Sequence, residues 1–379
     1  MTQIPLSSPD ITQHEIDAVT QVLRSQTLSL GPKLPEFEQR LAKVAGRRYC
    51  VAVNSGTSAL HLAVRAMGIG TGDRVVTTPF SFIASANCIL MEGATPVFVD
   101  VDPEDYNIDV DAVACAIEDG EKRGEPIRAV LGVDVFGRPA DWPALESLAR
   151  RHSLRLIEDS CEAIGATLGG RPAGNFGELG AFAFYPNKQM TTGEGGALVT
   201  DDEELVHLAQ SMRNQGRDDG MGWLAHGRLG FNYRLSDIQC ALGLAQLDRL
   251  PGFLAKRSAV AAMYATHLGD LDEIHLPLPL EGGELSWFVY VVRLADRFGQ
   301  SDRDRLIQGL RDRGIGSNAY FPSIHLQPFY AKSFGFDRGS FPICESISDR
   351  TFALPFHNNL SEEDVRTVAS ALKQLLRSR

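Results

Sequence analysis

The chain has 379 residues, of which 37 are Lys or Arg and 48 are Asp or Glu, so its formal net charge is −11. This acidic balance argues against a nucleic-acid-binding module, and a hydrophobic fraction of 44% argues against a disordered or fibrous chain. The sequence shows no basic-then-apolar leader and no run of about 18 apolar residues, so we expect a cytoplasmic protein without a membrane span.

From residue 50 onward, short β-branched runs alternate with stretches long enough for helices. The predicted strands lie at residues 50–53, 74–78, 96–101, 129–135 and 154–157, and the predicted helices at 56–67, 82–91, 109–118 and 142–151. This alternation predicts a parallel α/β sheet with helices on both faces. Ligands of such sheets bind at the carboxyl ends of the strands, so functional residues are expected there.

The pattern changes after residue 180. Two strand-like runs at 181–185 and 197–200 are separated by a short polar loop, which predicts that they pair antiparallel. A helix is expected at 203–212. The glycine-rich stretch at 214–230 has the composition of a mobile or partner-contacting loop.

The C-terminal part is predicted as a smaller α+β domain. The capping box at 236–239 begins a helix that we expect to end near Leu250, because Pro251 interrupts the pattern. We place the domain boundary there, with a large domain at residues 1–250 and a small domain at 251–379. The small domain is expected to contain a helix to about residue 267, a strand at 287–294, a helix from 301 to 314 and a last helix after the capping box at 361–364.

Two candidate ligand-binding segments lie next to predicted strands. In Asn54-Ser-Gly-Thr-Ser58, Gly56 permits a tight turn and the following helix amides form an anion site, although an ordinary N-cap turn has the same pattern. Asp159 ends a strand, where it is either a ligand-binding carboxylate or a helix cap. Glu162 faces the same site if the chain turns helical there.

Lys188 follows an apolar strand in a loop bent by Gly193, Gly195 and Gly196. A lysine in such a place is either a solvated surface charge or a desolvated amine nucleophile. The phosphate turn, the strand-end aspartate and this lysine together supply an anion anchor, a pyridinium partner and a Schiff-base amine, which predicts a pyridoxal 5'-phosphate site. The six cysteines form no C-x-x-C pair, so no metal site is predicted.

Five blocks in order along the sequence resemble the sugar aminotransferases of the DegT/DnrJ/EryC1/StrS family. They are NSGTSAL at 54–60, PFSFIAS at 79–85, EDSCEAIG at 158–165, NKQMTTGEGG at 187–196 and GFNYRLSD at 230–237. The resemblance extends over nearly the whole chain. It implies the fold type I of pyridoxal-phosphate transaminases, with a mostly parallel seven-stranded sheet in a large domain, a smaller C-terminal α+β domain, and a homodimer with shared active sites.

The resemblance also implies roles for residues that match the motifs of the family. Lys188 would hold the cofactor as a Schiff base and carry protons, and Asp159 would pair with the pyridine nitrogen. Phe82 would stack on the ring, and Glu162 would lie near the ring hydroxyl. Asn232 of the partner subunit would reach the phosphate.

Two further groups of residues are expected at the site. The phosphate would be cradled by Gly56, Thr57 and Ser58. The sugar substrate would be contacted by Tyr185, Tyr320 and His325, although a purely structural role for the histidine remains an alternative. The sequence departs from the family at Ala183, where many members carry a phosphate-binding serine, and at Glu162, where many carry glutamine. We expect a greater reliance on the remaining phosphate donors, and a Glu162 that is neutralised or turned away from the ring oxygen.

The activity implied by the resemblance is transfer of an amino group from L-glutamate to a nucleotide-linked keto-deoxysugar, for surface polysaccharide or glycosylated-metabolite biosynthesis. The likeness of residues 187–196 to perosamine-type members favours a 4-keto-6-deoxyhexose. Two alternatives stay open. One is a 3-keto-sugar or cyclitol aminotransferase of the same fold. The other is a non-catalytic binding or regulatory relative, against which Lys188 and Asp159 count.

Overall fold

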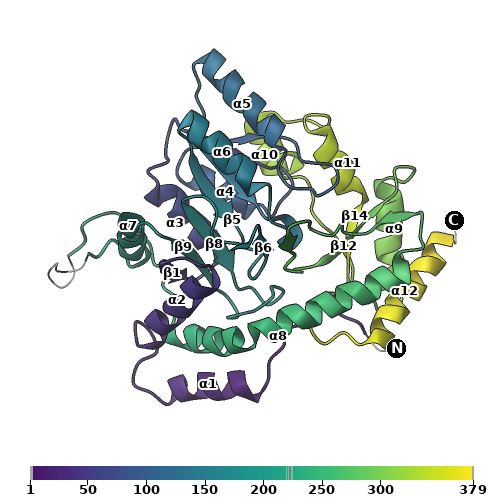
Figure 1. The fold of residues 1–379 in the computed structure, drawn as a ribbon, viewed down its shortest axis with the longest axis horizontal. Helices are drawn as coiled ribbons and strands as arrows, with labels where there is room; N and C mark the ends of the chain where they lie inside the picture. Colours follow the sequence, from purple (N-terminus) through teal and green to yellow (C-terminus); the bar gives the residue numbers. More distant parts are fainter. Residues whose placement is uncertain (1–2, 219, 221, 223–224, 378–379) are drawn as a thin grey trace.

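The computed structural model describes residues 3–218, 220, 222 and 225–377, and its largest element is a seven-stranded sheet (Figure 1). The strand order is β1-β9-β8-β5-β4-β2-β3. Parallel pairs join β8, β5, β4, β2 and β3, whereas β9 is antiparallel to both of its neighbours. The strands are β1 (Tyr49–Val53), β2 (Arg74–Thr77), β3 (Thr95–Phe98), β4 (Ala129–Val133), β5 (Arg155–Asp159), β8 (Leu179–Ala183) and β9 (Gly196–Thr200). The mostly parallel sheet implied by the resemblance and the antiparallel pairing of β8 with β9 are therefore confirmed.

Helices cover both faces of this sheet, as the alternating pattern predicted. Successive side chains of a strand point to opposite faces, so on β1 Val51 and Val53 belong to one hydrophobic core and Cys50 and Ala52 to another. The first face packs against α3 (Gly56–Ala66), α4 (Ala84–Met91) and α7 (Glu203–Arg213). The second face packs against α2 (Lys33–Val44), α5 (Val110–Arg123), α6 (Trp142–His152) and the first half of α8.

A second, four-stranded antiparallel sheet has the order β10-β12-β14-β13. Its strands are β10 (Ile274–His275), β12 (Tyr290–Leu294), β13 (Asn318–Ala319) and β14 (Thr351–Leu354). Its core includes residues of α9 (Gln300–Arg311), α12 (Glu362–Arg377) and the second half of α8. The remaining elements are α1 (Gln13–Leu23), α10 (Pro328–Phe334), α11 (Pro342–Arg350), the short 3₁₀ turns η1 (Val135–Gly137) and η2 (Ile324–Leu326), and a small sheet of β6 (Thr167–Leu168), β7 (Arg171–Pro172) and β11 (Gly283–Glu284).

The helix α8 (Asp237–Leu268) is continuous and runs along both sheets (Figure 1). The predicted end of this helix near Leu250 is wrong, because Pro251 lies inside the helix. Ile4 pairs with Ile315 and belongs to the core of the second sheet, so the first residues of the chain pack against the C-terminal part. The division of the chain at residue 250 stays a prediction.

Residues 219, 221, 223 and 224, part of the stretch predicted as a mobile or partner-contacting loop, lie outside the described residues. Within the described ranges, no helix is both long enough and apolar enough to cross a membrane.

Candidate active site

The turn between β1 and α3 forms one end of a pocket. Ser55 is the N-cap of α3, and its Oγ accepts a hydrogen bond from the Ser58 amide (3.1 Å). Among the described residues, the amides of Gly56 and Thr57 have no acceptor, as is usual in a first helical turn. A Cβ on Gly56 would lie 2.6 Å from the Cβ of Ala183, so a larger residue does not fit there. Unpaired amides at a helix N-terminus can bind an anion.

Asp159 lies at the carboxyl end of β5, between the parallel strands β4 and β8. It is 4% exposed and lines the same pocket. The Ser85 hydroxyl donates to its Oδ2 (2.6 Å), and the Cys161 amide donates to its Oδ1 (3.1 Å). These two donors fix the orientation of the carboxylate at the pocket wall.

The neighbouring Glu158 does not line the pocket, because alternate residues of a strand point to opposite faces. It is fully buried and accepts hydrogen bonds from the amides of Gly174 (2.6 Å) and Phe176 (2.7 Å). Burial raises its pKa well above the usual value, and the nearby Asp134 carboxyl raises it further. Asp159 is therefore the carboxylate of this pair that a ligand can reach.

Lys188 enters the pocket from the loop after β8. Its Nζ is 3.4 Å from Glu162 Oε1 and 3.8 Å from the centre of the Phe288 ring. The side chain is only 12% exposed. The amine is thus largely removed from solvent and lies between a carboxyl group and an aromatic face, which both attract a cation.

Glu162 is buried beside this amine, and its Oε2 accepts a hydrogen bond from the Phe136 amide (3.0 Å). Burial raises the pKa of Glu162, and the positive charge of Lys188 partly offsets this effect. Glu162 therefore takes up a proton more readily than an exposed glutamate does, and its relation to the ring oxygen stays a prediction. A carboxyl group and an amine at this separation can exchange a proton.

The pocket has a volume of about 500 Å³, which is enough for a cofactor-sized ligand. Phe82 and Tyr185 line it and are 59% and 53% exposed, so each presents an aromatic face to a ligand. Tyr320 lines the pocket from the end of β13, and burial raises its pKa to about 12. Asn187 also lines the pocket. Its buried Oδ1 has no hydrogen-bond partner within the described part of the chain.

Three of the predicted site residues do not line the pocket. The Ser58 hydroxyl donates to Asn54 Oδ1 (2.7 Å), so Ser58 stabilises the turn. Asn232 is exposed on its own chain, where its carbonyl accepts a hydrogen bond from Asn54 Nδ2 (3.3 Å). His325 is fully buried and its Nε2 is 2.9 Å from Glu345 Oε1. The alternative structural role of His325 fits this position, and the sugar contact stays a prediction.

Two residues that contact the site were missed by the sequence analysis. Ser85 donates to Asp159, and it lies in the block at 79–85 that carried part of the resemblance. Phe288 contacts the amine of Lys188 from a segment 100 residues further along the chain, and the alternating strand pattern there gives no sign of this contact.

The comparisons with known proteins identify the family. The family model described as the DegT/DnrJ/EryC1/StrS aminotransferase family matches residues 9–373. The chain belongs to this family. GDP-perosamine synthase from Caulobacter vibrioides is 37% identical over 380 residues, covering 99% of each chain. The spore coat polysaccharide biosynthesis protein SpsC from Bacillus subtilis is 35% identical over 384 residues, covering 99% of this chain and 97% of the relative. The PLP form of Spr1654 from Streptococcus pneumoniae has a TM-score of 0.93 at 29% identity, covering 99% of both chains.

This aminotransferase is thus a pyridoxal-phosphate enzyme of sugar or polysaccharide biosynthesis. The pocket has the donor set that the cofactor needs. It presents unpaired amides for a phosphate at Gly56 and Thr57, a buried carboxylate for a ring nitrogen, an exposed aromatic face for stacking at Phe82, and an amine at Lys188. These residues fit pyridoxal 5'-phosphate.

Proposed function

We propose that this aminotransferase moves an amino group from L-glutamate to C4 of a nucleotide-linked 4-keto-6-deoxyhexose. The observation that carries the proposal is the convergence of Lys188, Asp159 and the free amides of Gly56 and Thr57 on one pocket. The choice of sugar is supported by the likeness of residues 187–196 to perosamine-type members and by the match to a relative named GDP-perosamine synthase. The cytoplasmic location expected from the sequence stays a prediction.

The proposal assigns each lining residue a task. Gly56 and Thr57 bind the cofactor phosphate through their amides, and Asp159 pairs with the protonated ring nitrogen as a charge-assisted hydrogen bond. Phe82 stacks on the ring. Tyr185 and Tyr320 also line the pocket and are assigned to contact the sugar.

Proton transfer is assigned to Lys188. When bound, pyridoxal phosphate supplies an electron-accepting ring that stabilises the charge left as a Cα–H bond of the amine breaks. The Lys188 Nζ takes the proton from this carbon of the donor, and in the return half-reaction it delivers a proton to C4 of the acceptor sugar. Glu162, 3.4 Å from the same Nζ, accepts or supplies a proton as the amine changes charge. The burial of both side chains excludes water from this exchange.

A homodimer with shared sites is part of the proposal. Asn232 is exposed and does not line the pocket of its own chain. Its side-chain amide is therefore available to a second copy of the chain. In this arrangement Asn232 of the partner subunit supplements the phosphate amides, which matters here because Ala183 lacks a hydroxyl. A measured molar mass of one chain in solution would contradict the shared site.

The first experiment is the visible absorption spectrum of the purified protein with pyridoxal phosphate, before and after addition of L-glutamate. We expect the band of the lysine-bound cofactor to appear and then to convert to the pyridoxamine form. The enzyme in its pyridoxamine form is then mixed with each member of a panel of nucleotide-linked 4-keto sugars, 3-keto sugars and a keto-cyclitol. Return of the band with 4-keto sugars supports the proposal, whereas return only with a 3-keto sugar or the cyclitol contradicts the C4 assignment.

The substitution Ala183→Ser is expected to tighten cofactor binding. A hydroxyl at this position lies next to Gly56 and adds one donor to the phosphate, so the Kd for pyridoxal phosphate should fall about tenfold. Ala183→Gly is the matched control, because it changes the volume without adding a donor and should not tighten binding. Equilibrium dialysis gives both constants. An unchanged Kd for Ala183→Ser would place the phosphate away from this turn.

A further inference from the structure

Arg257 on α8 is a buried cation with an unusual set of partners. It is 2% exposed, and no carboxylate among the residues described forms an ion pair with it. Burial alone lowers the pKa of its guanidinium to about 10. Buried arginines are normally paired with an acid, because removing an isolated charge from water is costly. The contacts that replace a carboxylate here therefore indicate what this residue does.

Those contacts are three backbone carbonyl groups from two segments and the face of the Phe356 ring, whose centre lies 5.4 Å from the guanidinium carbon. Arg257 Nη2 donates to the carbonyl of Lys188 (3.2 Å), and Nη1 donates to the carbonyls of Trp287 (3.1 Å) and Phe288 (3.1 Å). The guanidinium thus joins the loop of Lys188 to the segment that enters β12. An arginine suits this arrangement, because its planar group presents several donors in fixed directions.

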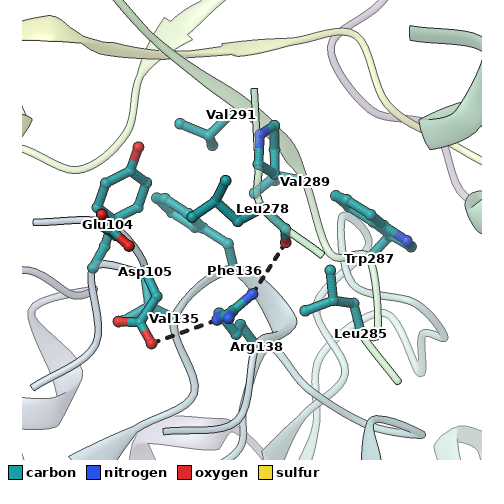
Figure 2. A pocket seen from close by; sticks show the side chains of 12 residues that line it. Glu104, Asp105, Val135, Phe136, Arg138, Leu278, Leu285, Trp287, Val289 and Val291 are labelled. Carbon is teal, nitrogen blue, oxygen red and sulfur yellow. Dashed lines mark hydrogen bonds and ion pairs between the residues drawn. The ribbon is translucent and has the colours of Figure 1, made fainter. Parts of the chain in front are cut away.

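The second segment supplies the aromatic ring beside the lysine amine. Trp287, Val289 and Val291 line a separate pocket of about 40 Å³ (Figure 2), which is too small for the cofactor. Alternate residues of an extended segment point to opposite sides, so Phe288 points away from that pocket. Its ring centre lies 3.8 Å from Lys188 Nζ.

A second bond keeps the same two segments together. Gln189, next to Lys188, donates through Nε2 to the carbonyl (3.0 Å) and hydroxyl (2.8 Å) oxygens of Ser286. Loss of Arg257 therefore leaves the segments attached at Gln189, while the carbonyls of Lys188 and Phe288 lose their shared donor. The effect of such a change is expected at the lysine side chain rather than across the whole fold.

We infer that Arg257 is a positioning residue for Lys188, acting through the Lys188 carbonyl and through the Phe288 ring that it holds against the lysine amine. The inference rests on the proposed function for the role of that amine in catalysis. The contacts explain why a cation is buried at this point of α8. They also connect the second half of α8 to the Lys188 amine, although Arg257 itself does not line the pocket.

The test measures the reactivity of Lys188 in the full chain without cofactor. Trinitrobenzenesulfonate labels the lysines, and peptide mass spectrometry gives the rate at Lys188 relative to Lys122, whose side chain is 70% exposed on α5. Loss of an aromatic contact to a buried ammonium should raise the relative rate at Lys188 about tenfold in Arg257→Met. Arg303→Met is the matched control, because Arg303 is 6% exposed, binds the Ser348 carbonyl and does not contact Lys188.

Substitutions of Phe288 provide an independent test if Arg257→Met does not fold. Phe288→Leu retains the carbonyl that Arg257 binds but removes the ring, so labelling of Lys188 should rise as in Arg257→Met. Phe288→Tyr keeps an aromatic face and should restore the slow rate. In the cofactor-loaded enzyme, Arg257→Met should lower kcat about tenfold and leave KM for glutamate within about twofold, because Arg257 does not line the pocket. Phe288→Leu should lower kcat by a similar factor.

Two results would overturn the inference. One is a labelling rate at Lys188 that is the same in wild type, Arg257→Met and Phe288→Leu. The other is an equal rise in Arg303→Met, which would indicate general loosening of the C-terminal part. Borohydride reduction of the wild type with pyridoxal phosphate separates these results from a failure of the proposed function. If Lys188 is not modified by that reduction, the proposed function fails, while the labelling comparison still tests Arg257.

Discussion

The substitution Lys188→Ala is expected to lower kcat for transamination by about 10⁴-fold and to abolish covalent retention of cofactor after borohydride reduction. Among the described residues that line the pocket, Lys188 is the only lysine, so no other amine can take over either task. Burial of the side chain at 12% exposure also keeps water from acting as an equivalent base. Single-turnover kinetics with L-glutamate measure the loss.

The control for this prediction is Lys122→Ala, which removes an exposed lysine of α5 and should leave kcat unchanged. A small free amine such as methylamine should restore part of the activity of Lys188→Ala, because the truncated side chain leaves room beside Glu162 for an external base. Full activity of Lys188→Ala would refute the assigned proton carrier. Loss of activity without rescue, together with retained borohydride labelling at another residue, would refute the assigned attachment site.

The sheet and its helices could be predicted from sequence because burial on both faces produces short apolar strands between amphipathic stretches. The end of α8 could not be predicted in this way. Pro251 and Gly252 are local helix-breaking signals, but Leu250 and Phe253 on either side of them are 4% and 2% exposed. The packing of these flanking side chains in the core outweighs the local preference, while Pro251 itself is exposed.

The candidate site shows a similar division. Asp159 ends a buried strand and Lys188 follows another, so their positions at the carboxyl edge of the sheet follow from the strand pattern alone. Ser85 contacts Asp159 because the tertiary fold brings the first turn of α4 to the carboxyl end of β5, which no local pattern encodes. The position of His325 depends on Glu345, a partner 20 residues further along the chain, and a lone histidine in the sequence gives no sign of that bond.

The substitution Asp159→Asn is expected to lower kcat by about 10²- to 10³-fold while leaving the fold intact. Asparagine has nearly the same shape, and its amide oxygen can still accept the Ser85 hydroxyl or the Cys161 amide. It carries no charge, however, so the ring nitrogen of the bound cofactor loses the anion that keeps it protonated. The loss should appear in kcat for L-glutamate, with a thermal midpoint close to that of wild type.

The Ser85→Ala substitution separates charge from orientation at this carboxylate. It removes one donor to Asp159 Oδ2 and retains the charge, so its effect on kcat should be smaller, about tenfold. If the two variants lose equal activity, the orientation set by Ser85 is the main contribution and the charge of Asp159 is secondary. If Asp159→Asn is fully active, Asp159 is not the partner of the ring nitrogen. Because Glu158 is bonded to the amides of Gly174 and Phe176, it is not available to replace Asp159.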